Sequence, residues 1–217
     1  MDVRSFTVGP VAENSYVFRR QGSDRGLIVD PGDEPDRLLG AIGALGIELE
    51  AILLTHCHFD HVGAVAPVAK ATGAPVYCPE IEVPVLADIM SYVPWPGFGP
   101  YESWDAEETV GGGERLELAG FGIEVVFTPG HSPGHVTYAI EDEGPEGPET
   151  HLFSGDVLFQ GSVGRTDLPG GDWGTLEASI KGLLDAYPDE ARVYPGHMGL
   201  TTLGAERAAN PFLAGIS

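Results

Sequence analysis

The block Thr-His-Cys-His-Phe-Asp-His at residues 55–61 constrains this chain more than any other feature of its sequence. It directly follows the apolar run Ala-Ile-Leu-Leu at 51–54, which predicts a buried strand. On extended backbone His56 and His58 point to one side of the chain while Cys57 points to the other. Because α/β folds present functional groups at the carboxyl ends of their strands, the block predicts a metal site at a sheet edge.

The same arrangement recurs at three later strand ends. Predicted strands at 124–127, 152–153 and 193–194 lead to His131, Asp156 and His197. Imidazoles and carboxylates are the ligands expected for zinc, iron or manganese at an open catalytic site, whereas closed structural zinc sites favour cysteines. The simplest partition, with two divalent ions and zinc as the first choice, gives one ion to His56, His58 and His131, the other to Asp60, His61 and His197, and Asp156 to both. Five of the seven histidines fall in this scheme, which argues against unrelated surface or core histidines.

Short β-rich runs and helical patterns alternate along the chain and predict one α/β domain over residues 1–217. The opening strands, at 4–8, 15–18 and 26–30, predict an antiparallel start to a sheet. Helices are expected at 35–45, 62–72 and 175–187, and further strands at 51–54, 123–127, 136–140, 152–153 and 192–194. The Pro and Gly cluster at 144–148 predicts an exposed hairpin loop.

Residues 90–104 form a second irregular segment, in which five aromatic side chains recur every third residue among prolines and glycines. This composition excludes a regular helix. It suits a loop packed over apolar surface, which leaves three roles open: a structural cover, a lid over the site, or a subunit contact.

Three side chains near or between the ligands have less specific patterns. His135 lies four residues after His131, and we expect it to hydrogen-bond within the site and help to set ligand orientation, with a packing role as the alternative. Cys57 is expected to be buried behind the metal block rather than nucleophilic. His151 precedes a strand without an evident partner, so we expect an ordinary surface histidine.

Taken together, residues 55–61, the later His131, Asp156 and His197, and Asp-Pro-Gly at 30–32 resemble the metallo-β-lactamase superfamily. The resemblance covers nearly the whole chain. It implies a four-layer αββα sandwich, with two mixed sheets packed face to face and helices outside, and a dinuclear site at one edge. It also implies that Asp30 supports a ligand or stabilises a turn and does not bind metal itself.

Two metal ions that share a water lower its pKa toward neutrality and hold a hydroxide facing an electrophilic carbon, which predicts a hydrolase. Asp60 and Asp156 are the expected catalytic carboxylates, with Asp60 orienting the hydroxide while it binds metal. A thioester suits this machinery because a thiolate leaves without a strong acid. The segments 161–167 and 196–212 resemble compact thioester hydrolases similar to glyoxalase II, the hydroxyacylglutathione hydrolases.

By this second resemblance, Arg165 would lie near the site mouth and contact a carboxylate of the thiol-bearing part of the substrate. The alternative is a surface arginine paired with an acid. The chain departs from the larger glyoxalase II enzymes because twenty residues follow His197, too few for their C-terminal helical domain. Another thiol carrier than glutathione, or a broader range of thioesters, therefore stays open.

A different reaction class competes with hydrolysis. Persulfide dioxygenases share the implied fold and a similar Gly-Arg-Thr-Asp segment but bind one iron, whose ligands would map to His56, His131 and Asp156. The sequence around residues 132–135 and 195–197 resembles the hydrolase branch more closely. A lactonase has no positive signature, a secreted β-lactamase would need an export signal, and a binding module without catalysis would usually lack some ligands.

The charge of the chain limits the kinds of partner it can bind. Its 33 acidic and 11 basic residues give a formal net charge of −22. Nucleic acid is not expected as a partner because phosphates are bound by clustered lysines and arginines. No stretch reaches the length of a membrane span and the start lacks the pattern of a secretory signal, so we expect a cytoplasmic protein without membrane contact. Two cysteines agree with a reducing compartment. The expected partner is a small thioester, and the oligomeric state stays open.

Overall fold

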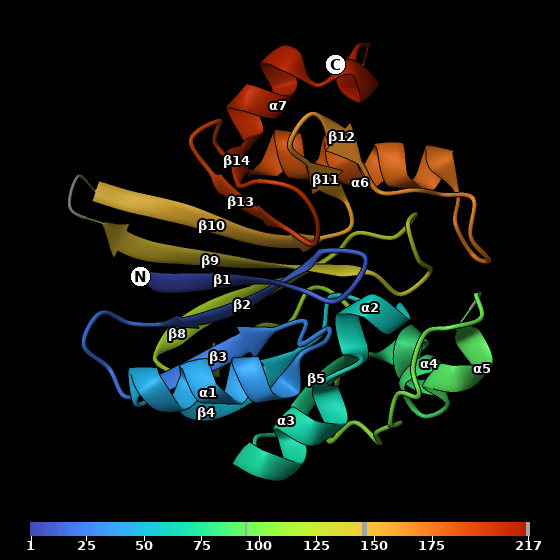
Figure 1. Ribbon diagram of the computed structural model, residues 1–217. Coiled ribbons are helices and arrows are strands. Elements are labelled where there is room, and N and C mark those ends of the chain that lie inside the picture. Colours follow the sequence, from blue (N-terminus) through green and yellow to red (C-terminus); the bar gives the residue numbers. More distant parts are fainter. Residues whose placement is uncertain (94, 145–146, 216–217) are drawn as a thin grey trace.

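The computed structural model describes residues 1–93, 95–144 and 147–215, and within them the longer strands form two sheets (Figure 1). The first sheet has the order β1-β2-β3-β4-β5-β6. Its strands are β1 (Asp2–Val8), β2 (Glu13–Arg19), β3 (Arg25–Val29), β4 (Glu48–Leu53), β5 (Val76–Pro79) and β6 (Glu108–Val110). The strands β1 to β3 pair antiparallel, as predicted for the start of the chain, and β3 to β6 run parallel.

The second sheet has the order β14-β13-β10-β9-β8-β7. Its strands are β7 (Arg115–Leu118), β8 (Phe121–Phe127), β9 (Val136–Gly144), β10 (Gly147–Gly155), β13 (Arg192–Pro195) and β14 (Thr201–Thr202). Only the pair β10 and β13 is parallel among the described strands of this sheet. The strands β11 (Leu158–Phe159) and β12 (Ser162–Val163) form a separate short ribbon. Both large sheets are therefore mixed.

The central strands are buried on both faces, which explains the continuous apolar run before the metal block. In β4, Ala51 and Leu53 pack into the core between the sheets, whereas Ile52 faces the helices outside the first sheet. Aromatic rings fill much of the core between the sheets; the ring centroids of Phe18 and Phe153, one from each sheet, lie 4.6 Å apart. Burial of this apolar surface is the main force that holds the two sheets together.

Helices cover the outer faces of both sheets (Figure 1). On the first sheet lie α1 (Pro35–Leu45) and α3 (Val65–Thr72), and on the second lies α6 (Trp173–Ala186). The layers therefore run helix, sheet, sheet, helix, which confirms the predicted αββα sandwich. Shorter helices are α2 (Phe59–Val62), α4 (Val83–Leu86), α5 (Ile89–Tyr92) and α7 (Leu203–Ala209), with 3₁₀ turns η1 (Glu80–Glu82) and η2 (Pro211–Leu213). None of the described helices is long and apolar enough to cross a membrane.

The helix predicted over 62–72 is wrong at its start, because two helices occupy this part of the chain. Residue 64 leaves the helical conformation between α2 and α3, and its N–H donates to the carbonyl oxygen of Pro31 (3.0 Å) instead of continuing the helix. The predicted hairpin at 144–148 joins β9 and β10, whose ends pair at Gly144 and Gly147, while 145–146 lie outside the described residues.

The prediction of a surface position for His151 is wrong. Its side chain is buried in β10, and only 1% of the residue's surface is exposed. Nδ1 lies 3.0 Å from the hydroxyl of Tyr194 on the neighbouring strand β13. The imidazole therefore has a partner across the sheet, which a pattern along one strand does not show.

The aromatic segment packs beside the metal block. Phe59 in α2 contacts the rings of Trp95, Phe98 and Tyr101, with ring centroids 4.8 to 6.1 Å apart. Residues 90–92 belong to the short helix α5. Residues 93 and 95–104 form no helix or strand, and residue 94 lies outside the described residues. The segment thus packs over α2, an arrangement that a structural cover and a lid share.

Candidate metal centre

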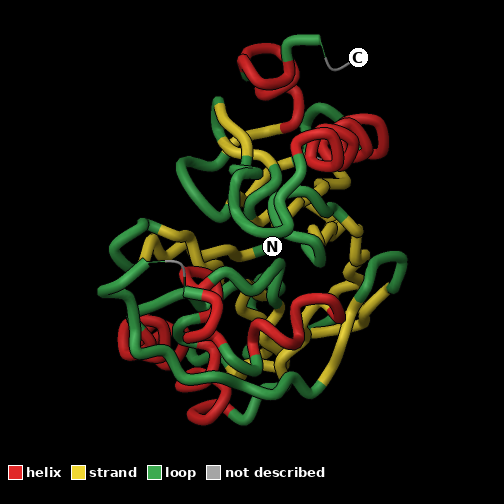
Figure 2. The backbone as a smooth tube through the Cα atoms, turned by 90° about the vertical axis from the view of Figure 1, so that its right-hand side faces the viewer, coloured by secondary structure: helices red, strands yellow, loops and turns green. Residues whose placement is uncertain are grey.

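Four strand ends bring the predicted ligands to one edge of the two sheets. Residues 55–61 follow β4 in the first sheet, whereas His131, Asp156 and His197 follow β8, β10 and β13 in the second. Figure 2 looks onto this end of the molecule, where loops gather between the helices of the outer layers. The site therefore depends on the packing of the two sheets against each other.

A first group consists of three imidazoles. His56 Nε2 lies 3.1 Å from His58 Nδ1, and this nitrogen lies 2.8 Å from His131 Nε2. His56 and His131 are buried, and His58 is half-buried. The three nitrogens converge on one point, as imidazole ligands of a metal ion do.

A second group combines the remaining predicted ligands. Asp60 Oδ2 lies 3.3 Å from His197 Nε2 and 3.9 Å from His61 Nε2. Asp60 and His61 come from α2 and His197 follows β13, so this group also joins the two sheets. One carboxylate and two imidazoles form a second set of donors suited to a divalent ion.

Asp156 reaches both groups. Its Oδ2 lies 3.3 Å from His131 Nε2 in the first group and 3.6 Å from His197 Nε2 in the second. Its Oδ1 lies 3.3 Å from His61 Nε2. The position of this carboxylate between the groups agrees with the bridging role predicted from the ligand count.

Two buried atoms test whether metal ions fit here. His61 Nε2 and Asp156 Oδ1 have no hydrogen-bond partner of acceptable geometry within the described residues. Leaving buried polar atoms unsatisfied costs about 1–3 kcal/mol each. A divalent cation between them would satisfy both, so the residues present fit a metal in the second group.

Hydrogen bonds hold three of the imidazoles with Nε2 toward the site. His61 Nδ1 donates to Asp30 Oδ2 (3.0 Å), and His131 Nδ1 donates to the carbonyl oxygen of Arg165 (2.8 Å). The hydroxyl of Thr55 donates to the same Asp30 oxygen, so His56 Nδ1 donates to this hydroxyl (3.1 Å). Because each Nδ1 carries the proton, the lone pair of each Nε2 is available to a metal.

His135 acts on the backbone of Asp156. Its Nε2 accepts the N–H of Asp156 (3.1 Å), and its Nδ1 lies 3.0 Å from the hydroxyl of Thr128. Since Nε2 accepts, Nδ1 carries the proton and donates to Thr128. The ring therefore holds the backbone of Asp156 in place, and it lies beside the ring of His56, with ring centroids 5.0 Å apart.

The side chain of Arg165 is engaged within the protein. Its Nε and Nη2 donate to the two carboxylate oxygens of Asp167 at 2.7 and 2.8 Å, and its guanidinium carbon lies 5.6 Å from the centre of the Trp95 ring. The side chain is 48% exposed. The sequence left two alternatives for Arg165, a substrate contact and a pairing with an acidic side chain. The structure shows the pairing with Asp167.

Comparison with known proteins settles the family. The family model "Metallo-beta-lactamase superfamily" matches residues 8–197, which is most of the chain and includes every predicted ligand. The chain belongs to the metallo-beta-lactamase superfamily. Among curated superfamily members, the probable metallo-hydrolase YqgX of Bacillus subtilis is 39% identical over the full length of both chains. Hydroxyacylglutathione hydrolase GloC of Haemophilus influenzae is 38% identical over 86% of both.

Solved structures of the superfamily share the fold closely. The crystal structure of BLEG-1 B3 metallo-beta-lactamase has a TM-score of 0.88, with 38% identity over 98% of this chain and 99% of the other. The structure of TTHA1623 in a di-iron-bound form has a TM-score of 0.81, with 43% identity over 97% and 100%. ETHE1 from Myxococcus xanthus reaches 0.78, with 25% identity over 99% and 85%. The neighbours thus bear different names on one fold.

The electrostatics of this superfamily site differ between the two donor groups. Burial alone would lower the pKa of His61 and His197, but the carboxylates of Asp156 and Asp60 raise both, so a metal ion bound there would replace a proton. Burial lowers the pKa of His56 well below its ordinary value, and burial and the nearby His131 lower the pKa of His58 to about 3. Burial alone would raise the pKa of Asp156, but His61 and His131 hold it below its ordinary value. The site therefore presents neutral imidazoles at His56 and His58 and an ionised carboxylate at Asp156.

Three residues at the start of β2 support the superfamily site and escaped sequence reasoning. Asn14 Nδ2 donates to the carbonyl oxygens of Pro195 (3.2 Å) and Met198 (2.9 Å), and the Tyr16 hydroxyl donates to Pro195 (2.7 Å). Glu13 is fully buried with Oε1 3.9 Å from His61 Nδ1, and burial raises its pKa. Polar residues inside a buried strand were the available signal, because such groups are buried only when they have partners.

Proposed function

We propose that this chain is a dinuclear metal-dependent hydrolase that cleaves a thioester. The position of Asp156 carries the proposal, because one carboxylate within 3.3 Å of His131 and 3.6 Å of His197 joins two donor groups. The ligands are His56, His58 and His131 for one ion, Asp60, His61 and His197 for the other, and Asp156 for both. Zinc is the proposed metal; the di-iron form of TTHA1623, 43% identical, supports iron as the alternative, and manganese has no such support.

Two divalent ions held there would supply a water of lowered pKa and would polarise the scissile carbonyl. The chain's own contribution is to place and orient. Burial raises the pKa of Asp60, but His61 and the hydrogen bond with His197 outweigh this and lower it, so the carboxylate is ionised near neutral pH. Asp60 therefore accepts a hydrogen bond from the attacking water and orients its lone pair, while Asp156 keeps the two donor groups in register.

A thioester is the proposed substrate on chemical grounds and by similarity. A thiolate leaves without protonation by a strong acid, so the residues named above suffice. The hydroxyacylglutathione hydrolase GloC, 38% identical over 86% of both chains, supports this bond type. Arg165 is proposed to contact a carboxylate of the thiol-bearing part at the cavity mouth, and to do so it must exchange Asp167 for the substrate.

The second candidate is a mononuclear iron persulfide dioxygenase that uses His56, His131 and Asp156. The similarity of ETHE1 over 99% of this chain supports this second candidate. It would leave the donor group of Asp60, His61 and His197 without a function. A lactonase ranks third, since no residue of the site favours it.

Parallel assays of one purified sample decide between these functions. Protein reconstituted with zinc, and separately with iron, is assayed for thiol release from S-lactoylglutathione and for oxygen uptake with a persulfide. We expect thiol release and no oxygen uptake beyond that of the metal salts alone. Oxygen uptake by a sample with one iron per chain, without thioester cleavage, would replace the proposal with the dioxygenase.

A further inference from the structure

A cavity of about 680 Å³ opens directly over the candidate ligands. Asp60, His131, Asp156 and His197 are at its floor, and two different parts of the chain form its walls. One wall comes from α4, α5 and Trp95, and the other comes from the segment that contains β11, β12 and the residues after them. A volume of this size matches pockets that enclose ligands of many atoms.

The walls above the ligands are mainly apolar. The side chains that define them include Val85, Ile89, Trp95, Phe159, Val163 and Leu168. Glu82 also lines the cavity, but it is buried and its Oε1 accepts the backbone N–H of Gly134 (2.8 Å). Ser91, Tyr92, Ser132 and Ser162 also line the cavity, and Ser132 Oγ has no hydrogen-bond partner within the described residues. The interior thus offers mainly apolar contact, with a few hydrogen-bonding groups.

Basic side chains at the cavity are limited to its rim. Arg165 is the one lysine or arginine among the described residues that line the cavity, and its Nε and Nη2 donate to Asp167. The formal net charge of −22 adds a repulsive field for anions. A carboxylate at the far end of an acyl chain, away from the metal ions proposed at the floor, would therefore lose its hydration without gaining a basic side chain as partner.

We propose that the cavity selects thioesters whose acyl group is an apolar chain of several carbons, with the thiol part at the rim beside Arg165. This inference rests on the proposed thioester hydrolysis and names its substrate class. The acyl carbon must lie at the ligands, so an acyl chain continues into the apolar interior. A short hydroxyacyl group would leave most of the 680 Å³ unfilled.

The test uses N-acetylcysteamine thioesters, because this small thiol carries no charge. We expect kcat/KM of the zinc-loaded protein to rise from acetyl to hexanoyl by up to about fourfold for each methylene, which corresponds to about 0.8 kcal/mol per buried CH₂. Hexanoyl and adipoyl thioesters form a matched pair with six acyl carbons, and the terminal carboxylate of adipoyl should lower kcat/KM at least tenfold. Equal or falling kcat/KM along the series would overturn the inference, as would a preference for adipoyl.

Two valines of α4 provide matched variants. Val85 and Val83 are both partly buried against the same core, but only Val85 is among the described residues that line the cavity. Val85→Phe narrows the cavity and should shift the preferred acyl length by at least two carbons toward shorter chains, whereas Val83→Phe should leave it unchanged. The same shift in both variants would show a general effect of packing and would contradict the assignment.

A binding measurement separates this inference from the proposed function. The thioether S-(2-oxoheptyl)-N-acetylcysteamine resembles the hexanoyl thioester and cannot be hydrolysed. Its dissociation constant, followed by tryptophan fluorescence, should be at least tenfold lower than that of the 2-oxopropyl analogue. Binding that depends on acyl length, without cleavage of any thioester, would support the apolar pocket and refute the proposed hydrolysis. Cleavage that does not depend on acyl length would support hydrolysis and refute the apolar pocket.

Discussion

Asp156 is the residue on which the two donor groups depend, since its carboxylate lies against His131 and His197. Asp156→Ala and His58→Ala should each lower kcat at least about 100-fold, beyond the loss typical of residues that only orient ligands. Metal content should fall below two ions per chain, measured by mass spectrometry of the metals. Far-ultraviolet circular dichroism should stay unchanged, because neither side chain belongs to the apolar core.

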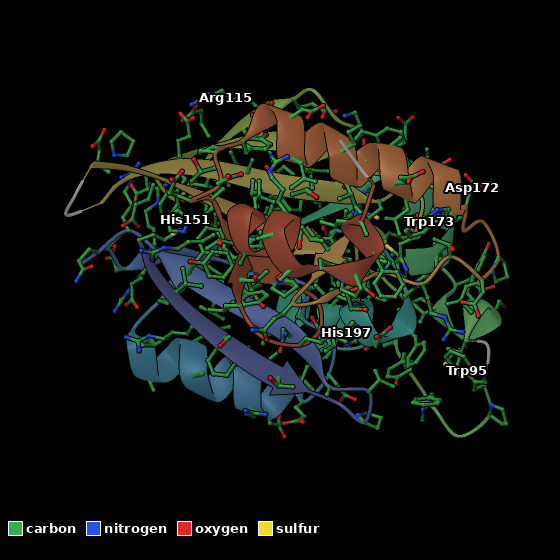
Figure 3. All side chains as sticks on the ribbon, turned by 90° about the horizontal axis from the view of Figure 1, so that it is seen from above. Trp95, Arg115, His151, Asp172, Trp173 and His197 are labelled. Carbon is green, nitrogen blue, oxygen red and sulfur yellow. The ribbon has the colours of Figure 1, made fainter. Side chains whose placement is uncertain are left out.

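His151→Ala is the matched control for these variants. This histidine is at least as buried as Asp156 and His58 but pairs with Tyr194, and Figure 3 shows His151 and His197 on different parts of the molecule. The variant should lose stability and retain both metals. Full activity of Asp156→Ala or His58→Ala would refute the dinuclear assignment.

Asp30 is expected to act through His61. Its carboxylate accepts three hydrogen bonds, from the backbone N–H and hydroxyl of Thr55 and from His61 Nδ1. In Asp30→Asn an amide group must face one of these donors, so the affinity for the second metal should fall about 10- to 100-fold in calorimetric titration. The exposed Asp36→Asn is the control, and equal affinities in the two variants would show that Asp30 does not position His61.

At the scale of elements, we expect α6 in the outer layer to stabilise the fold without affecting metal binding. Ile180 is fully buried between α6 and the second sheet. Ile180→Ala should lower the free energy of unfolding by about 2–5 kcal/mol, measured by urea denaturation of the metal-free protein, with metal content unchanged. Asp185→Ala on the exposed face of α6 should change it by less than about 0.5 kcal/mol. Similar losses in both variants would contradict the assigned packing.

The elements also show what sequence reasoning could reach. The proposed ligands could be predicted because each follows a run of buried apolar residues, although β8 before His131 has Glu124 and Phe127 exposed. The break at residue 64 could not be predicted, because α2 ends where the backbone N–H of this residue donates to Pro31, which is distant in the sequence. His151 was misplaced for the same reason, because its partner Tyr194 lies on the neighbouring strand. Glu13 was missed because its neighbour His61 lies in α2, far along the chain.

The short strands mark a second limit. Strands such as β14 and β12 have two residues, so no alternation of side chains can reveal them. The side chain of Arg165 is a third case: the sequence suggested a substrate contact, and the structure pairs it with Asp167, two residues away. The backbone carbonyl oxygen of Arg165 accepts a hydrogen bond from His131, and a pattern of side chains cannot predict this backbone role.

For the whole molecule, the net charge of −22 should make stability depend on salt. Repulsion among the carboxylates favours unfolding, and salt screens it over a Debye length of about 10 Å at 0.1 M. The melting temperature of metal-free protein should therefore rise between 20 mM and 500 mM sodium chloride, followed by circular dichroism. A melting temperature that stays constant or falls would show that the ion pairs of the fold outweigh the repulsion.

The central claim is that two metal ions held between two sheets perform hydrolysis, and a metal titration tests it most directly. Metal-free protein receives zinc in steps while hexanoyl-N-acetylcysteamine and S-lactoylglutathione cleavage are followed at each step. We expect the rate on the preferred thioester to keep rising until two equivalents per chain are bound, because Asp156 joins two complete donor groups. A rate that reaches its maximum at one equivalent, or no cleavage of either thioester at two, would contradict the account.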